Sequence, residues 1–114
     1  MLSQGDIALI PIPFTDLSAQ KKRPVIVISN NAYNAASSNI VVAAMTSNTL
    51  LNNYTFTIQT TDLEEGVLNH PGQVRADKIY TLAQSIVVKR FGKVKPIVVS
   101  KIKTLLIGLT TPTI

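Results

Sequence analysis

The sequence predicts a mainly β protein with one C-terminal helix, folded as a strongly curved antiparallel sheet or small barrel. Three observations support this fold class. Short apolar runs rich in Val and Ile recur between polar segments, as in a protein of several short strands. Near the C-terminus the apolar spacing changes to the period of a helix. The chain has 114 residues, enough for one hydrophobic core, so we expect a single domain over residues 1–114.

The first predicted strand covers residues 6–10. Pro11 ends this strand or places it at an edge, because proline cannot donate to a ladder. The polar composition of residues 14–22 predicts a loop. Pro24 then holds Arg23 in an extended conformation at the start of the next strand.

Two continuous apolar strands follow, at residues 25–28 and 40–45, and we expect both to be covered on two faces. The segment between them, 29–39, is rich in Asn, Ser and Ala, which predicts a loop with room for one helical turn. The second of the two strands ends on Thr46 and Ser47, so these hydroxyls are expected at the edge of the sheet.

The second half of the chain begins with residues 54–59, whose clean alternation predicts a half-buried strand. Residues 60–71 are polar and are expected to form a connection. A further strand is predicted at 72–79, and 80–82 either continue it or turn. The last candidate strand, 86–91, is expected to stop at Gly92.

The final segment has the three-to-four residue apolar spacing of an amphipathic helix, and Pro96 fits its first position. Its β-branched residues are poor helix formers, but the period outweighs that propensity. Gly108 and Pro112 can end the helix. The predicted apolar stripe consists of Val98, Ile102, Leu105, Leu106 and Leu109.

The stretch from Gly72 to Ile79 is the most informative part of the sequence. Period two sends Val74 and Ala76 to the core, and it places Gln73, Arg75 and Asp77 together on the opposite face. An arginine and an aspartate at this spacing can share one phosphate or one proton path. The alternative interpretation is a surface ion pair that contributes less than about 1 kcal/mol.

Composition excludes several kinds of site. The chain has no cysteine and a single histidine, His70, so neither a thiolate nor a His-based metal site is expected, and no cofactor is implied. No signal peptide or membrane-spanning run is present, which predicts a cytoplasmic protein. The net charge of +5 favours a polyanionic partner, whether nucleic acid, an anionic membrane or an acidic protein segment.

Four groups of polar residues lie at strand ends, on an open strand face or before the helix: Lys22 with Arg23, Thr46 with Ser47, Arg75 with Asp77, and Lys93 with Lys95. Arginines bind phosphate bidentately, hydroxyls can orient it, and a carboxylate can take a proton from a nucleophile. Each group also has an ordinary explanation as a solvated loop, a turn or a surface pair.

In their order and at this chain length, several stretches resemble the MazF/PemK-like toxins of bacterial toxin–antitoxin systems. They are Gly5–Ile7, Lys22–Ser29, Thr46–Ser47 and Val74–Leu82. The resemblance covers essentially the whole chain. It implies an SH3-like barrel with a C-terminal helix, usually a homodimer. It also implies a metal-independent, sequence-selective endoribonuclease of single-stranded mRNA, which an antitoxin neutralises through an acidic segment.

The resemblance also assigns roles to residues. Arg75 and Asp77 match the family's Arg-x-Asp pair, and Arg23 matches the arginine of its Arg-Pro motif. Asp77 would then accept a proton from an RNA 2′-hydroxyl, Arg75 would stabilise the charge that develops on the phosphate, and Arg23 would hold that phosphate. The candidate substrate-binding residues are Thr46, Ser47, Lys22 and Gln73.

The loop from Asp16 to Lys22 departs from the Gly-Glu-Gln-type or His-containing loop of many members, and His70 has no family counterpart. Two other functions fit a small basic barrel. A gyrase-binding toxin of the CcdB kind is disfavoured because the chain has no tryptophan. A non-catalytic nucleic-acid-binding barrel is disfavoured because the chain has only three Tyr and three Phe to stack on bases.

Overall fold

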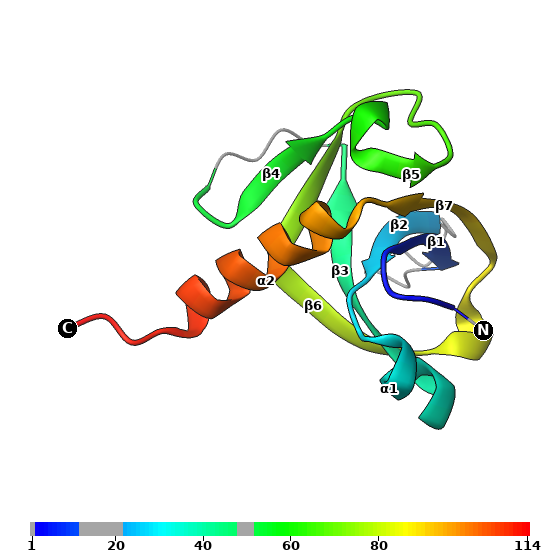
Figure 1. Ribbon diagram of the computed structural model, residues 1–114, viewed down its shortest axis with the longest axis horizontal. Coiled ribbons are helices and arrows are strands. Elements are labelled where there is room, and N and C mark those ends of the chain that lie inside the picture. The colour runs from blue at the N-terminus through cyan, green and yellow to red at the C-terminus, as the bar shows by residue number, and fades with distance from the viewer. Residues whose placement is uncertain (1, 12–21, 48–51) are drawn as a thin grey trace, which may run out of the picture.

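The computed structural model describes residues 2–11, 22–47 and 52–114. Its strands are β1 (Asp6–Pro11), β2 (Lys22–Val27), β3 (Asn39–Thr46), β4 (Thr55–Ile58), β5 (Leu63–Glu65), β6 (Gly72–Ala83) and β7 (Lys89–Val94). Its helices are α1 (Asn31–Ala36) and α2 (Pro96–Thr110), with 3-10 turns η1 (Thr60–Asp62) and η2 (Gln84–Ile86). The seven strands form one antiparallel half-barrel in the order β4-β6-β3-β2-β1-β7-β5, and α2 crosses it (Figure 1).

The predicted fold class, mainly β with a C-terminal helix, is therefore confirmed. The sheet has two apolar faces, because neighbouring residues of β2 and β3 alternate between two buried clusters. The cluster under α2 contains Ile7, Ile26, Ala43, Met45, Ile58, Leu63, Val74, Ala76, Val94, Val98 and Ile102. The cluster on the opposite face contains Ala8, Ile10, Val25, Val27, Ile40 and Val42.

Strand β2 begins three residues before the predicted start, at Lys22. Pro24 is accommodated because it pairs with Leu9 of β1, while the ladder to β3 begins only at Val25, opposite Ala44. Beyond this pair, β2 and β3 are no longer paired. The ends of these two strands therefore leave space between them.

The predictions for residues 60–71 and for Gly92 are wrong. The supposed connection contains η1 and the short strand β5, and Gly92 lies inside β7 instead of ending it. Both errors have one cause, which is the close approach of β5 and β7. A Cβ atom on Gly92 would lie 2.8 Å from the Glu65 carbonyl oxygen, and one on Gly66 would lie 2.7 Å from the Phe91 carbonyl oxygen.

Helix α2 begins at Pro96, as predicted, passes through Gly108 and ends at Thr110 before Pro112. Its first half packs on the sheet through Val98 and Ile102, which are buried. The second half of the predicted stripe does not pack there, because the helix extends away from the sheet (Figure 1). Within the described residues, no helix is long and apolar enough to cross a membrane.

The β5–β7 contact makes a prediction about stability. Gly66 has a φ of +91°, so Gly66→Ala combines an unfavourable backbone conformation with a clash against β7. We expect this change to lower the free energy of unfolding by about 1–3 kcal/mol in urea denaturation. Gly108→Ala is the matched control. A Cβ at this exposed helical position meets nothing within 4 Å, and alanine should add about 0.5–1 kcal/mol. Equal effects at the two glycines would contradict this account.

Candidate active site

The site begins at an irregularity in the β3–β6 ladder. Ala44 pairs with Arg75, and the preceding residue of β3, Ala43, pairs with Ile79. The three β6 residues 76–78 therefore have no partner on β3. Such bulges bend a strand and re-aim its side chains, and they are common next to active sites. Asp77 is the middle residue of this bulge.

Arg75 and Asp77 form a bidentate ion pair. Arg75 Nε donates to Asp77 Oδ1 at 3.0 Å, and Arg75 Nη2 donates to Asp77 Oδ2 at 2.8 Å. The two side chains are 18% and 21% exposed, so the pair is shielded on most sides yet open to a ligand. The predicted placement of both side chains on one face of the strand is confirmed.

The pair shifts the pKa of both groups away from neutrality. The hydrogen bond from Arg75 lowers the pKa of Asp77, and the same contact raises the pKa of Arg75, while burial opposes both shifts. The lowered pKa means that the pair stabilises the folded protein above the ordinary carboxyl pKa of 3.8. That contribution is lost as the pH falls through the lowered value.

A cavity of about 340 Å³ lies where β2 and β3 are no longer paired. Four of the predicted site residues line this cavity, together with Pro24 and Met45: Lys22, Arg23, Thr46 and Ser47. Lys22 is exposed and Arg23 is half-buried, so one face of the cavity is positively charged. The cavity thus combines cationic groups with two hydroxyls, as an anion-binding site requires.

Strand register relates the cavity to the ion pair. Val25, Ala44 and Arg75 form one cross-strand row, and strand β3 lies between β2 and β6. Cross-strand partners share a face, as do residues two apart on one strand, so Arg23, Thr46 and Arg75 share one face of the sheet. Neighbouring strands are about 4.8 Å apart, so long arginine side chains from β2 and β6 can reach one ligand above β3.

Gln73 lies in the row next to Arg75, opposite Thr46 on β3 and Thr57 on β4. Its side chain is buried, and its amide nitrogen donates to the Thr57 hydroxyl. The structure therefore brings Gln73 to the site, but it commits the amide nitrogen to β4. The carbonyl oxygen of the side chain is the atom that a ligand would contact.

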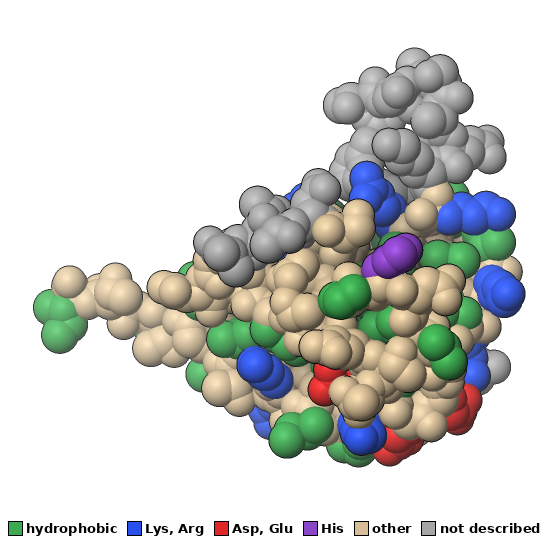
Figure 2. Space-filling model, turned by 90° about the horizontal axis from the view of Figure 1, so that it is seen from above, with side chains coloured by type: hydrophobic (Ala, Val, Ile, Leu, Met, Phe, Trp, Pro, Cys, Tyr) green, Lys and Arg blue, Asp and Glu red, His purple; other side chains and the backbone are tan. Residues whose placement is uncertain are grey.

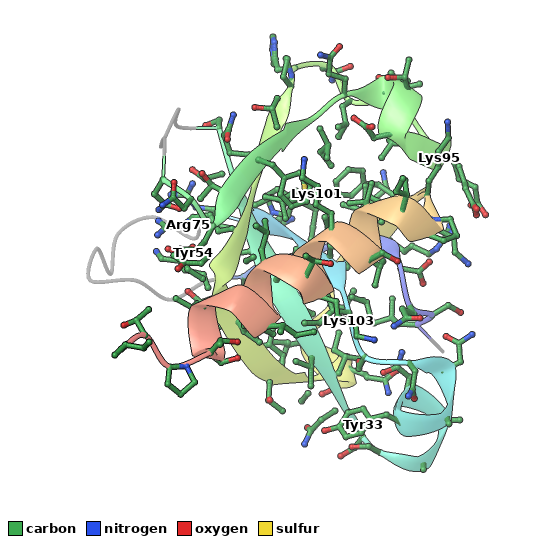
Figure 3. All side chains as sticks on the ribbon, turned by 60° about the vertical axis from the view of Figure 1, so that its left-hand side comes forward. Tyr33, Tyr54, Arg75, Lys95, Lys101 and Lys103 are labelled. Atoms are coloured by element: carbon green, nitrogen blue, oxygen red, sulfur yellow. The ribbon has the colours of Figure 1, made fainter. Side chains whose placement is uncertain are left out.

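Sequence analysis did not identify the turn at residues 52–54 as part of the site. The Ala76 N–H donates to the Tyr54 carbonyl at 3.0 Å, and Thr55 pairs with Arg75. Figure 3 shows Tyr54 next to Arg75. The Asn52 side chain also contributes to the lowered pKa of Asp77. Only the Asn-rich turn composition before β4 marked this segment in the sequence.

Other residues singled out in the sequence lie elsewhere. The loop from Asp16 to Lys22 is outside the described residues, apart from Lys22. His70 is exposed on the face that Figure 2 shows, in the segment between β5 and β6. Lys93 and Lys95 lie on β7 and just after it, and three strands separate β7 from β6 in the sheet. Among the described residues, no three His, Asp or Glu side chains are grouped so that they could hold a metal ion.

Comparisons with known proteins agree with this arrangement. Residues 3–109 match the family described as PemK-like, MazF-like toxin of type II toxin-antitoxin system. The chain is 25% identical to an endoribonuclease solved in complex with its cognate antitoxin from a mycobacterial species, with a TM-score of 0.75 over 98% of this chain and 100% of that chain. A mycobacterial endoribonuclease is also 25% identical, with a TM-score of 0.73 over 97% and 95% of the two chains.

A MazE–MazF structure from Deinococcus radiodurans is 20% identical, with a TM-score of 0.75 over 95% of this chain and 94% of that chain, and it supports the fold. No curated protein sequence matches the chain significantly. The family match extends over nearly the whole chain, and it includes Lys22, Arg23, Thr46, Ser47, Arg75 and Asp77. The chain therefore belongs to the PemK-like, MazF-like family of toxins from type II toxin–antitoxin systems.

Proposed function

We propose that this protein is a toxin that acts as a metal-independent, sequence-selective endoribonuclease on single-stranded mRNA, and so inhibits translation in the cytoplasm. The observation that carries the proposal is the bidentate Arg75–Asp77 pair, which lies on the same sheet face as Arg23 and Thr46 of the neighbouring cavity. The net charge of +5 suits a polyanionic substrate. Two structural relatives at 25% identity are endoribonucleases.

The proposed reaction is attack of an RNA 2′-hydroxyl on the adjacent phosphate. The O2′–P bond forms and the P–O5′ bond breaks, which leaves a 2′,3′-cyclic phosphate and a 5′-hydroxyl. Arg75 stabilises the negative charge that develops on the phosphate, as preorganised donors do, and Arg23 holds the phosphate. Thr46 and Ser47 orient it from the cavity.

The role of Asp77 depends on the release of Arg75. In the free protein both carboxylate oxygens accept from the guanidinium, and the low pKa makes Asp77 a weak base. A phosphate that takes one N–H of Arg75 frees one oxygen of Asp77 and removes part of the cause of the low pKa. Asp77 can then accept the 2′-hydroxyl proton. Arg75 remains protonated, so it acts through its charge and not as an acid.

The first prediction concerns the pair itself. Arg75→Ala and Asp77→Ala should each reduce RNA cleavage by about 10²–10⁴-fold, because each removes charge stabilisation or the proton acceptor. The assay is incubation of purified protein with a long RNA in EDTA, followed by mapping of discrete cuts. Lys89→Ala is the control, since it removes an exposed positive charge from β7 and should leave cleavage unchanged.

The outcomes of this assay separate the proposed function from its alternatives. Cleavage by Asp77→Ala at the wild-type rate would show that the assignment is wrong. Salt-sensitive RNA binding by the wild-type protein without any cut would favour the non-catalytic barrel. Neither binding nor cleavage would favour a toxin that binds a protein target such as gyrase.

The second prediction concerns pH. The pKa of Asp77 is lowered and that of Arg75 is raised, so the free protein keeps both groups charged between about pH 5 and about pH 8. Because kcat/KM reports the titration of the free enzyme, its value should be nearly constant across this range. An acid limb with a midpoint inside the range would contradict the assigned roles.

Two protein partners complete the proposal. One is a cognate antitoxin whose acidic segment covers the positively charged cavity around Lys22 and Arg23, and a mycobacterial relative was solved with its antitoxin. The other is a second copy of this chain. The end of α2 carries Leu105, Leu106, Ile107 and Leu109 without a charged residue, and a helix that is apolar all round needs cover. Figure 2 shows this end of the chain projecting from the body.

The homodimer makes a third prediction. Ile107 is 55% exposed and Leu109 is 40% exposed, so replacing both by Lys should leave the fold intact and abolish association. Sedimentation at micromolar concentration should show a dimer for the wild type and a monomer for this variant. Val67→Lys is the control, because Val67 is 68% exposed in the segment before β6. A wild-type monomer would contradict the proposed dimer.

A further inference from the structure

The turn before β4 is closed by Asn52. Its Oδ1 accepts from the Tyr54 N–H at 2.8 Å. Its carbonyl oxygen accepts from the Thr55 hydroxyl at 3.3 Å and from the Thr55 N–H at 3.4 Å. These contacts fix the side chain of Asn52 at the entrance to the strand, because an asparagine that bonds the backbone two residues on adopts a defined Asx turn.

This turn is attached to the catalytic segment of β6. Thr55 pairs with Arg75, and the Tyr54 carbonyl accepts from the N–H of Ala76 at 3.0 Å. Ala76 separates the two members of the ion pair and belongs to the bulge, where it has no partner on β3. The backbone bond to Tyr54 therefore replaces the missing ladder bond and holds Asn52 beside the pair.

The chemistry of the amide indicates what Asn52 does there. The Tyr54 N–H occupies its oxygen, so the NH₂ group is the part of the side chain that remains to donate. The Asp77 carboxylate is an acceptor, and the Asn52 side chain lowers its pKa in the way that a hydrogen-bond donor does. Among the described residues, Arg75 on β6 and the Asp77 backbone also lower this pKa, and Tyr80 acts on Arg75.

We propose that Asn52 is a positioning residue for Asp77, which holds the carboxylate in place when the RNA phosphate draws Arg75 away. This inference rests on the proposed ribonuclease function for its consequence in catalysis. In the free protein Arg75 makes two bonds to Asp77, and the proposed reaction needs at least one of them to be released. A donor from β4 is not consumed by the phosphate, so it can keep the carboxylate oriented toward the 2′-hydroxyl.

The test uses Asn52→Asp and its neighbour Asn53→Asp. Asn52→Asp keeps an oxygen for the Tyr54 N–H, but it replaces the donor to Asp77 by a second carboxylate. Asn53→Asp adds the same charge at the adjacent exposed position and is the matched control. Carbon-detected NMR titration of the Asp77 carboxyl group reports its pKa in the free protein, without any need for RNA cleavage.

We expect the pKa of Asp77 to rise by about 1 or more in Asn52→Asp and by less than about 0.3 in Asn53→Asp. Asn52→Ala, which removes the donor without adding charge, should raise it by an intermediate amount. Equal values in the two Asp variants, or an unchanged value in Asn52→Ala, would overturn the proposal. The Ala variant also serves if Asn52→Asp does not fold.

The catalytic consequence has its own readout. If the wild-type protein cuts RNA, kcat/KM of Asn52→Asp should gain an acid limb and fall by about tenfold or more toward pH 5, while Asn53→Asp should keep the wild-type profile. A raised pKa with an unchanged profile would overturn the positioning role. If the wild-type protein does not cut RNA, the proposed function fails, and the NMR result still decides whether Asn52 acts on Asp77.

Discussion

Residues 76–78 of β6 lack a partner on β3, while the register on both sides of them is regular. The site depends on this interruption. Val74 and Ala76 stay fully buried beneath the sheet, so the backbone under the bulge cannot move freely. Asp77 is thereby presented to Arg75 on the opposite face, in a bidentate geometry that a flexible loop would not maintain.

The second constraint is the divergence of β2 and β3 at Pro24. It opens the cavity that Lys22, Arg23, Thr46 and Ser47 line, on the other side of β3 from the ion pair. One carboxylate thus lies near several cationic groups. In the free protein it neutralises Arg75, and a phosphate competes for the same guanidinium. Substrate binding and activation of the base are linked through this exchange.

Much of the fold was predictable because its signals are local. Period two placed Arg75 and Asp77 on one face, and the apolar run ending at Met45 placed Thr46 at a strand end. The bulge, the contact between Gln73 and Thr57, and the position of Asn52 depend on pairing between distant segments, so no local pattern shows them. Glycine at position 92 was misinterpreted because it can end a strand or admit a neighbouring backbone. The helical period likewise does not reveal how much of α2 is covered.

The central claim is that the Arg75–Asp77 site promotes attack by the RNA 2′-hydroxyl. It is tested most directly with two short RNAs that contain the mapped cut site, one of which carries a single 2′-deoxynucleotide on the 5′ side of the cleaved phosphate. In EDTA, the unmodified RNA should yield a 2′,3′-cyclic phosphate and a 5′-hydroxyl, and the deoxy-substituted RNA should remain intact at that position. Cleavage of the deoxy-substituted RNA at the same phosphate, or a product with a 5′-phosphate, would contradict the account.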